Sequence, residues 1–354
     1  MVRNCVISRP SQLSQLELAR WKEIQRLSPH LHRAFFSPTF SLACEAAGFD
    51  TRVAIIRRGD LIEAIFPFQY HDRLHLWMGL GEPIGGHLPD ASGVIAEPGW
   101  RISPAELVRL CRLGAIHINC LADGQPEFGL EGYELIPNYI VDLSEGYERY
   151  MEDLQSRNAD FVRDTGRRFR RATRALGNLV VRNLDSVSTE VLERLVSQKR
   201  AQYKRTHTGD ALSDVRTFRI LEYLASQTNE DCRVFHTTLE AGGKVIAEHF
   251  GLQYAGVLSY WFPVYDSDFQ QYSPGRLILW ELIKEASQNG ITMIDFGEGE
   301  SQYKRQFSSK SISSYKAYWE AGDIRSRLAK VYQSFYWRVE SVSQKFRTNF
   351  SSGR

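Results

Sequence analysis

The amino-acid sequence predicts an α+β fold in which helices cover both faces of a mixed β-sheet. Of the 354 residues, 43% are apolar and 24% are charged, which is an ordinary globular composition. This length accommodates two domains of roughly 150 to 200 residues each. One order of elements, an antiparallel hairpin followed by a strand, a helix and a strand, occurs in each half of the chain. That order places parallel and antiparallel pairs in one sheet, which defines the fold class.

The first half is predicted from alternation and helical periodicity. Its hairpin turns at residues 58–60, where a glycine stands between polar residues, and Ser103 is a plausible helix N-cap. In chain order, the predicted elements are a helix over 11–27, the hairpin over 51–71, a strand over 74–80, a helix over 103–114 and a strand over 115–121.

The second half repeats this order after two further helices. Its hairpin turns at Gly242 and Gly243, and its last helix ends on Gly290. The predicted elements are helices over 188–205 and 214–227, the hairpin over 232–253, a strand over 256–265, a helix over 273–290 and a strand over 291–297. The boundary between the two halves is expected near residues 138–147.

Composition excludes several classes of protein. The five cysteines are widely spaced without a CxxC pair, which argues against a disulfide scaffold or a zinc ribbon. The nine histidines show no paired-ligand spacing, so no metal is expected. The N-terminus does not resemble a signal peptide, and no apolar stretch is long enough to span a bilayer, so we expect a soluble cytoplasmic protein. The formal net charge of +2 favours no polyanionic partner by itself.

Two segments have distinctive charge patterns. Residues 157–182 carry eight arginines against two aspartates, with five of the arginines at helical spacing. This helix is either a solvated face or a docking surface for phosphates of a cofactor, a nucleotide-linked substrate or anionic lipid. Residues 324–354 form a basic amphipathic helix with one apolar stripe. The stripe is expected to pack on the body of the protein, with peripheral membrane contact as the alternative.

A short loop in the second half suits an anionic ligand. Ser273, Pro274 and Gly275 follow a predicted strand, and a helix begins directly behind them. A helix N-terminus offers unpaired N–H groups and the positive end of the helix dipole, which favour a pyrophosphate. Gly275 permits close backbone approach, and Arg276 adds a charged donor for a phosphate oxygen.

The same loop carries a family resemblance. Gln270, Ser273 and Gly275 resemble the Q/R-x-x-G-x-G/A loop of GNAT acetyltransferases, with serine in place of the first glycine. A wider pattern within residues 244–307, about 65 residues long, resembles the CelD-like acetyltransferase family, which is associated with cellulose and exopolysaccharide biosynthesis. The pattern reads EHFGL…YWFPVYD…YSPG…DFGEG…YK. The resemblance implies tandem GNAT-like domains, as in the FemABX peptidyltransferases, and a donor that is acetyl-CoA or another acyl-CoA.

Acyl transfer to an amine needs a base for the amine, a donor for the oxyanion and an acid for the leaving thiolate. His249, in a predicted strand, is the first candidate for the base, with a core histidine as the alternative. Asp266 and Asp295 follow or occupy neighbouring strands. Either could orient the histidine, bind the acceptor ammonium or act as the base, and Asp266 could simply cap the loop.

The segment after DFGEGES supplies two further candidates. GNAT enzymes often place a tyrosine here that protonates the leaving thiolate, so the resemblance implies that role for Tyr303, unless it is a packed aromatic. Lys304 either neutralises a phosphate or the oxyanion, or pairs with Glu298 or Glu300. In the first half, the glycine-rich loop at 79–86 lacks dinucleotide-binding spacing, and His87 and Asp90 behind it are candidates for an acceptor site.

The sequence therefore predicts three parts. Residues 1–143 form a GNAT-like domain that is non-catalytic or binds the acceptor, residues 144–323 form the acyltransferase domain, and residues 324–354 form the tail. No G-x-S-x-G nucleophile is present, so direct attack by a sugar, amino acid or envelope-precursor acceptor, on nitrogen or oxygen, is favoured. Two alternatives stay open: a FemABX-like transferase using aminoacyl-tRNA, or a non-catalytic module that binds a synthase or a membrane. DNA is not an expected partner.

Overall fold

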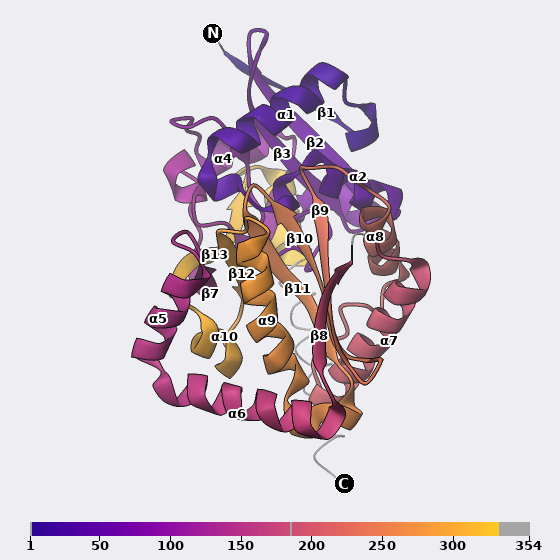
Figure 1. Cartoon of the computed structure of the whole chain (residues 1–354). Coiled ribbons are helices and arrows are strands. Elements are labelled where there is room, and N and C mark those ends of the chain that lie inside the picture. Colours follow the sequence, from indigo (N-terminus) through magenta and orange to yellow (C-terminus); the bar gives the residue numbers. More distant parts are fainter. Residues whose placement is uncertain (1, 185, 333–354) are drawn as a thin grey trace.

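The structure, a computed structural model, describes residues 2–184 and 186–332 (Figure 1). A smaller sheet lies in the first half, with strand order β1-β2-β3-β5 and antiparallel pairing throughout. Its centre is the predicted hairpin. The strands are β1 Arg3–Ser8, β2 Asp50–Arg58, β3 Leu61–Tyr70 and β5 Ile95–Ala96.

A larger sheet runs through both halves in the order β4-β6-β13-β7-β12-β11-β10-β9-β8. The pairs β4–β6 and β11–β12 are parallel, and the others are antiparallel. The mixed sheet expected from the sequence is therefore confirmed. Its strands are β4 Leu80–Gly81, β6 Ala115–Leu121, β7 Glu134–Asp142, β8 Leu179–Leu184, β9 Arg233–Ala241, β10 Lys244–Tyr254, β11 Val257–Tyr265, β12 Met293–Glu298 and β13 Lys310–Glu320.

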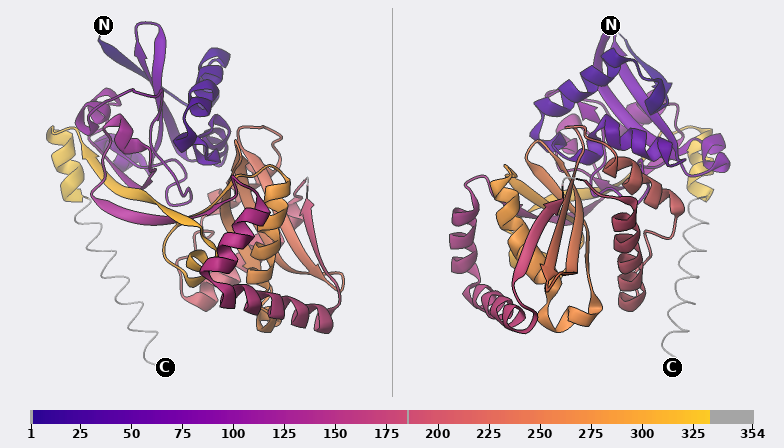
Figure 2. Two further views of the ribbon diagram at one scale, coloured as in Figure 1. Left: turned by 60° about the vertical axis from the view of Figure 1, so that its left-hand side comes forward. Right: turned by 45° about the vertical axis from the view of Figure 1, so that its right-hand side comes forward.

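The two halves exchange their last strands. β7 follows β6 along the chain, yet it pairs with β12 and β13, while β13 follows β12 but lies between β6 and β7. Figure 2 shows β13, in yellow, running beside β7 across the junction of the two halves. The predicted boundary at residue 143 falls directly after β7, and it stays a prediction because the strand before it is shared.

Helices cover both faces of the larger sheet. Strand β10 shows this, because its side chains alternate between two separate cores. Phe250 packs in one core with Leu195 of α7, and Ala247 packs in another with Leu277 of α9. The helices are α1 Gln15–Leu27, α2 Pro38–Ala46, α3 Arg73–Met78, α4 Pro104–Leu110, α5 Tyr147–Arg157, α6 Ala159–Leu176, α7 Thr189–Thr206, α8 Val215–Ala225, α9 Pro274–Gln288 and α10 Gln302–Phe307.

The repeated order of elements is present in the fold. The hairpin β2–β3, strand β4, helix α4 and strand β6 correspond to β9–β10, β11, α9 and β12, and each half contains a parallel strand pair joined by its helix. The local signals are also confirmed. Ser103 caps α4 by accepting from the Glu106 amide, and Gly242 and Gly243 have positive φ at the hairpin turn.

The strand predicted over 74–80 is wrong. Residues 73–78 form the short helix α3, and only Leu80 and Gly81 extend into a strand. The Asp72 carboxylate caps the helix by accepting from the amides of Leu74 and His75, and Gly79 ends it in the left-handed conformation.

Helical structure in the tail begins at residue 324 and continues to 332, where the description ends. Ile324 and Val331 are 76% and 70% exposed, and this helix packs against the body through Ala329 instead. The expected packing of the apolar stripe is therefore wrong for these turns, and the prediction for 333–354 lies outside the described residues. Across 2–184 and 186–332, no helix is long and apolar enough to cross a membrane.

Candidate active site

Two parallel strands part at the centre of the second half. β11 and β12 pair from Val257 opposite Met293 to Ser259 opposite Asp295, and their described pairing stops there. A register shift between β10 and β11 places Tyr260 and Trp261 opposite the single residue Gly251. This is a β-bulge, which bends β11 away from its neighbour. A side chain at Gly251 would meet the Ser259 carbonyl at 2.6 Å, so the bulge requires glycine here.

A cavity of about 320 Å³ opens beside the parted strands. Its walls come from β11, from the loop and first turn of α9, from α7 and from α10. All five residues predicted to bind the cofactor line it together with Tyr303. The lining residues are Gln202, Tyr260, Pro263, Val264, Tyr265, Gln270, Ser273, Pro274, Gly275, Arg276, Leu279, Tyr303 and Phe307.

The loop directs a helix N-terminus at this cavity. Ser273 adopts φ 58° and ψ 51°, a left-handed turn that redirects the chain, and Pro274 then occupies the first position of α9. Gly275 leaves room beside Tyr265, since an added Cβ would lie 3.4 Å from that ring. Pro274 has no N–H, and the amides of Arg276 and Leu277 donate to the Ser273 carbonyl oxygen. The Gly275 amide and the positive end of the helix dipole are therefore what make this end of the cavity a favourable place for an anion.

Two arginines flank the same helix end, one from α6 and one from α9. Arg168 donates to the Ser273 hydroxyl at 2.7 Å and to Asp164 at 2.8 Å, and Arg276 donates to Asp164 at 2.8 Å. These hydrogen bonds, those of Arg168 first, hold the pKa of Asp164 well below its usual range. The arginine-rich helix α6 therefore contacts the predicted phosphate loop, which its sequence alone did not reveal.

Tyr303 and Lys304 lie on α10, at the other side of the cavity. Burial raises the pKa of Tyr303 to about 12, so its hydroxyl keeps its proton at neutral pH. Lys304 donates to the carbonyl oxygens of Gly297 and Glu298. The neighbouring Arg305 guanidinium donates to the Glu300 carboxylate at 3.1 Å. Lys304 is therefore held by the last two carbonyl groups of β12 rather than by an acidic side chain.

Asp90, from the first half, reaches the end of β12. Its carboxylate lies so close to Gly297 that a Cβ added there would be 2.4 Å from the Asp90 Cγ. Burial, followed by the charge of Asp295, raises the pKa of Asp90 to about 7, while Lys304 opposes that shift. The structure thus places a carboxyl group that titrates near neutrality beside Lys304 and Tyr303.

Lys199 of α7 contributes another buried titratable group. Its side chain is 7% exposed, and its ammonium donates to the Pro263 carbonyl oxygen at 2.8 Å. Burial, with a contribution from the charge of Lys304, lowers the pKa of Lys199 to about 8. The hydrogen bond fixes α7 to the part of β11 that lines the cavity.

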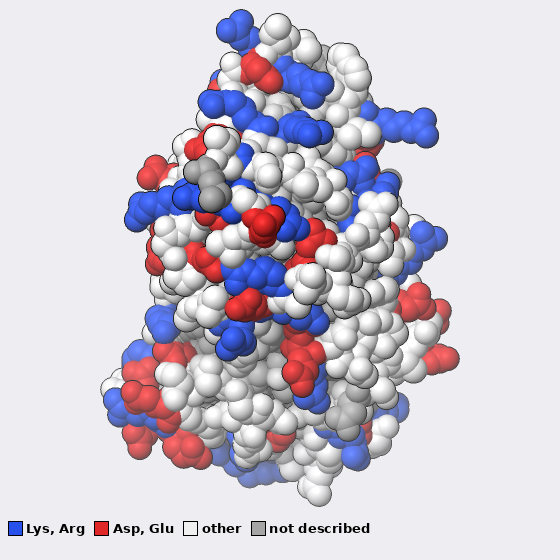
Figure 3. Space-filling model, turned by 90° about the horizontal axis from the view of Figure 1, so that it is seen from above, with Lys and Arg blue, Asp and Glu red and all other residues white. Residues whose placement is uncertain are grey.

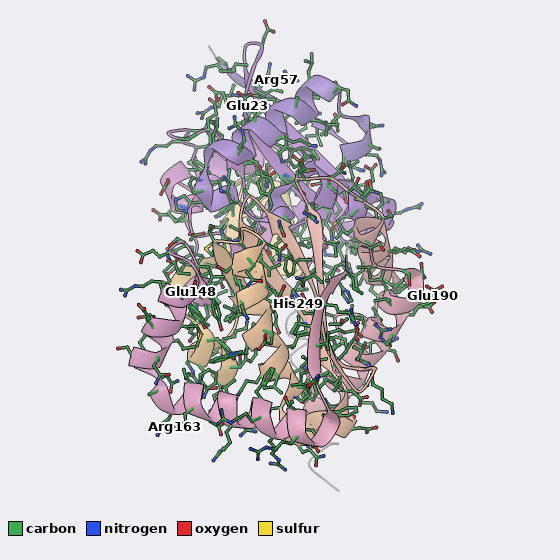
Figure 4. All side chains as sticks on the ribbon, viewed as in Figure 1. Glu23, Arg57, Glu148, Arg163, Glu190 and His249 are labelled. Atoms are coloured by element: carbon green, nitrogen blue, oxygen red, sulfur yellow. The ribbon has the colours of Figure 1, made fainter. Side chains whose placement is uncertain are left out.

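His249 lies in the interior of the larger sheet (Figure 4). It is fully buried, its ring centre lies 4.3 Å from that of Tyr260 in a stacked arrangement, and neither ring nitrogen has a hydrogen-bond partner among the described residues. Burial, followed by the charges of His236 and Lys199, lowers its pKa well below the ordinary value. Tyr260 stands between His249 and the cavity, so this histidine does not reach the cavity itself.

The two candidate aspartates have different surroundings. Asp266 accepts from the Asp268 amide at 3.0 Å and caps the short 3-10 helix Ser267–Tyr272, the capping alternative weighed from the sequence. Asp295 is 1% exposed, accepts from Arg33 at 2.7 Å and accepts from the Gly297 amide at 2.9 Å. Asp295 therefore joins the two halves through a buried ion pair.

Sequence reasoning missed Arg33, Arg168 and Lys199, and it associated Asp90 only with an acceptor. None of these residues stands in a motif, because each reaches the site from an element distant in sequence. Arg33 and Asp295, for example, are 262 positions apart. Among the described residues, no group of three or more potential ligand side chains could hold a metal ion.

Residues 160–305 match the family model described as acetyltransferase (GNAT) domain. The second half therefore carries a GNAT acetyltransferase domain, and it contains the parted strands and the cavity. A search of curated proteins gave no match.

Solved structures resemble the whole chain in fold. A crystal structure of FemX aligns with TM-score 0.60 and 9% identity, covering 94% of this chain and 99% of that one. A domain assigned to a lysylphosphatidylglycerol synthetase of Agrobacterium fabrum aligns with TM-score 0.54 and 11% identity, covering 89% and 94%. A conserved protein of unknown function from Bacteroides thetaiotaomicron has the same TM-score and identity, covering 87% and 99%.

Proposed function

We propose that the protein is an acyltransferase that moves an acyl group from acyl-CoA to an amine or hydroxyl acceptor by direct attack. One observation carries the proposal: a cavity lined by β11, beside the parted parallel strands, ends on the N-terminus of α9. An extended chain ending in a pyrophosphate has the shape and charge for this space, with its phosphates at Ser273–Arg276 and its thioester beside Tyr303.

The acceptor nitrogen would attack the thioester carbonyl carbon. The carbonyl oxygen becomes an oxyanion, the carbon–sulfur bond then breaks, and the thiolate leaves with a proton from the enzyme. An ammonium acceptor loses one proton to solvent before it attacks as the neutral amine, and it loses a second proton to a base of the site after the new bond forms. The site therefore needs one base and one acid on opposite sides of the reacting carbon.

Asp90 fits the base and Tyr303 fits the acid. A base is most effective when its pKa lies near the working pH, and that of Asp90 is raised to about 7. Tyr303 remains protonated and lines the cavity at the N-terminus of α9, the proposed donor cavity, where the thiolate would form. Lys304, held beside Asp90 and next to Tyr303, supplies positive charge for the oxyanion.

The placement of the other candidates favours different roles. Buried behind Tyr260 with its pKa lowered, His249 would support the wall of the cavity. Asp295 would position β12 through its pair with Arg33, and Asp266 would cap the loop. The narrower resemblance to the CelD-like family and a role in polysaccharide synthesis remain predictions about the acceptor.

A FemX-like use of aminoacyl-tRNA is the second candidate. It rests on the exposed arginines of α6, of which Arg170, Arg171 and Arg174 have no acidic partner among the described residues (Figure 4 shows Arg163 of this helix at the edge of the molecule). Figure 3 views the molecule from the side opposite α6, where basic and acidic side chains are interspersed, so that face adds no continuous basic surface to the arginines of α6.

The test is thermal stabilisation of the full chain by acetyl-CoA, longer acyl-CoAs, free CoA and deacylated tRNA. Saturable stabilisation by a CoA species is the expected result, because a ligand that binds only the folded state raises its melting temperature. The same measurement with Arg168→Met should show weaker binding, since this arginine flanks the phosphate loop. Arg149→Met, at an exposed pair on α5, is the matched control.

Stabilisation by tRNA alone would replace the donor with an aminoacyl-tRNA. No stabilisation by any of these ligands would leave a non-catalytic module with a transferase fold.

A further inference from the structure

A second cavity, of about 470 Å³, lies between the two halves. The first half contributes the end of β3, the loop after β4 and the middle of β6. The second half contributes residues 210–217, which lead into α8. Because its walls come from both halves, the cavity exists only when the halves are assembled.

Charged side chains in the lining of this cavity already have partners. Arg216 is bound to Asp214 at 2.6 Å, and its guanidinium lies 4.0 Å from the centre of the Phe49 ring. Glu82 accepts from Gln69 at 2.7 Å, and His71 lies 3.7 Å from it. The arginine is therefore already engaged, and carboxylates outnumber it in the lining. Such a surface suits hydroxyl and amino groups and disfavours a phosphate or a carboxylate.

One pair on the wall suits the recognition of a hydroxyl group. The Asn119 amide nitrogen donates to His87 Nδ1 at 2.6 Å, so the hydrogen of the neutral imidazole lies on Nε2. The pair thus presents an N–H donor from His87 and a carbonyl acceptor from Asn119. A sugar hydroxyl, which both accepts and donates, satisfies both groups.

One loop connects the wall of this cavity with Asp90, the proposed base. Leu88, in its wall, accepts from Trp261 Nε1 of the bulged strand at 2.8 Å. Asp90 comes two residues later and contacts Gly297 at the end of β12. Burial, followed by the charges of Asp210 in the cavity wall and of Asp90, raises the pKa of Tyr203 of α7 to about 12, so this tyrosine lies near both carboxylates. An acceptor in this cavity would therefore lie on the Asp90 side of the site, whereas the cavity at α9 lies on the Tyr303 side.

We propose that this second cavity is the acceptor site and that it takes an unphosphorylated amino sugar. The inference rests on the proposed acyltransferase function and adds the acceptor class to it. The sugar amine would attack the thioester carbonyl, Asp90 would receive the proton lost from nitrogen, and the thiolate would leave with the Tyr303 proton. The products are an N-acylated sugar and free CoA.

The experiment measures binding of D-glucosamine to the full chain by saturation-transfer NMR and calorimetry, without any acyl donor. Saturable binding is expected, and D-glucosamine 6-phosphate should bind at least about tenfold more weakly because its phosphate meets Glu82 and Asp214. Asn119→Leu should raise the glucosamine Kd about tenfold, since a sugar hydroxyl loses its acceptor.

Two further variants keep the test decisive. Asn183→Leu, the same substitution on β8 and away from both cavities, should leave the Kd unchanged. His87→Ala removes an exposed side chain, and its glucosamine Kd provides a second test of the cavity should Asn119→Leu fail to fold. Acetyl-CoA affinity is measured in parallel and should be equal in all of these proteins.

The outcomes separate the two proposals. Normal acetyl-CoA binding without saturable glucosamine binding, or glucosamine binding that ignores both cavity variants, overturns the acceptor site and leaves the acyltransferase intact. Tighter binding of the 6-phosphate overturns the substrate class. Glucosamine binding in a protein that binds no acyl-CoA removes the transferase and with it the acceptor role, leaving a sugar-binding cavity.

Discussion

At the scale of single residues, the surroundings of a titratable group decide its chemistry more than its type does. His249 titrates near neutrality in water, yet its enclosed ring is held neutral far below that range. Asp90 would ordinarily be ionised at pH 5, but burial and its acidic neighbour move its titration to about 7. The carboxyl group is therefore the better base here.

Replacing Asp90 by asparagine should lower kcat/KM by roughly two to four orders of magnitude, because the base is lost. In the wild type, kcat/KM should rise with pH and level off above about pH 7, where Asp90 is ionised. The variant should lack this limb. Rate profiles with a fixed acyl-CoA and acceptor check the prediction, with Asp266→Asn as the control that keeps the limb.

The same substitution has a consequence for stability. The folded pKa of Asp90 exceeds the unfolded value, so the folded state holds its proton more tightly. That contribution is complete below about pH 4 and is lost as the pH rises through 7. Unfolding measured from pH 4 to 8 should show this decline in the wild type and a smaller one in Asp90→Asn. Identical curves would mean that the folded pKa is not raised.

At the scale of elements, sequence patterns succeeded where the signal is local. Both hairpins, the Ser103 cap and the helix behind Ser273 follow from turn residues and periodicity, and the structure has them. The prediction for residues 74–80 failed because a short run of alternating apolar and polar residues was interpreted as a strand. Its Leu74, Leu76 and Trp77 are all exposed, so the alternation does not mark a buried face. The Asp72 cap decided the structure there.

The loop before α9 gives a prediction at this scale. Gly275→Asp should weaken acetyl-CoA binding by at least about tenfold, because its carboxylate would stand against the pyrophosphate. The variant should fold, since an added Cβ meets Tyr265 only at 3.4 Å. Calorimetric titration measures the effect. Gly209→Asp, where an added Cβ meets nothing within 4 Å, is the control, and equal affinity in both variants would remove the loop from the site.

At the scale of the whole molecule, the sequence could not predict which residues meet. Asp90 and Gly297, or Arg33 and Asp295, come together only because the exchanged strands hold the halves against each other. No periodicity or spacing relates such pairs. The residues predicted to bind the cofactor come from nearby segments of one half and line one cavity, whereas Asp90 of the other half was predicted only as part of an acceptor site.

Arg33→Met should destabilise the protein by about 3–5 kcal/mol, because it leaves the buried Asp295 without its partner. Arg33 and Asp295 side chains are 3% and 2% exposed, and Arg33 also donates to Asp123 at 3.1 Å. Denaturant unfolding measures the change. Arg149→Met, at a pair exposed by 64% and 71%, should cost less than about 1 kcal/mol, and similar losses in the two variants would contradict a buried junction.

The exchange of β7 and β13 also constrains how a ribosome can deliver this protein. The strand that joins β6 to β7 in the larger sheet, Lys310–Glu320, is translated after all the other described strands. Until it emerges, β6 and β7 present unsatisfied edges, and edges of this kind invite pairing with other chains. The nascent chain therefore cannot finish one half before starting the other. We expect the two halves to mature together, and chaperones that shield strand edges during translation should matter more to its yield than to that of proteins with separable domains.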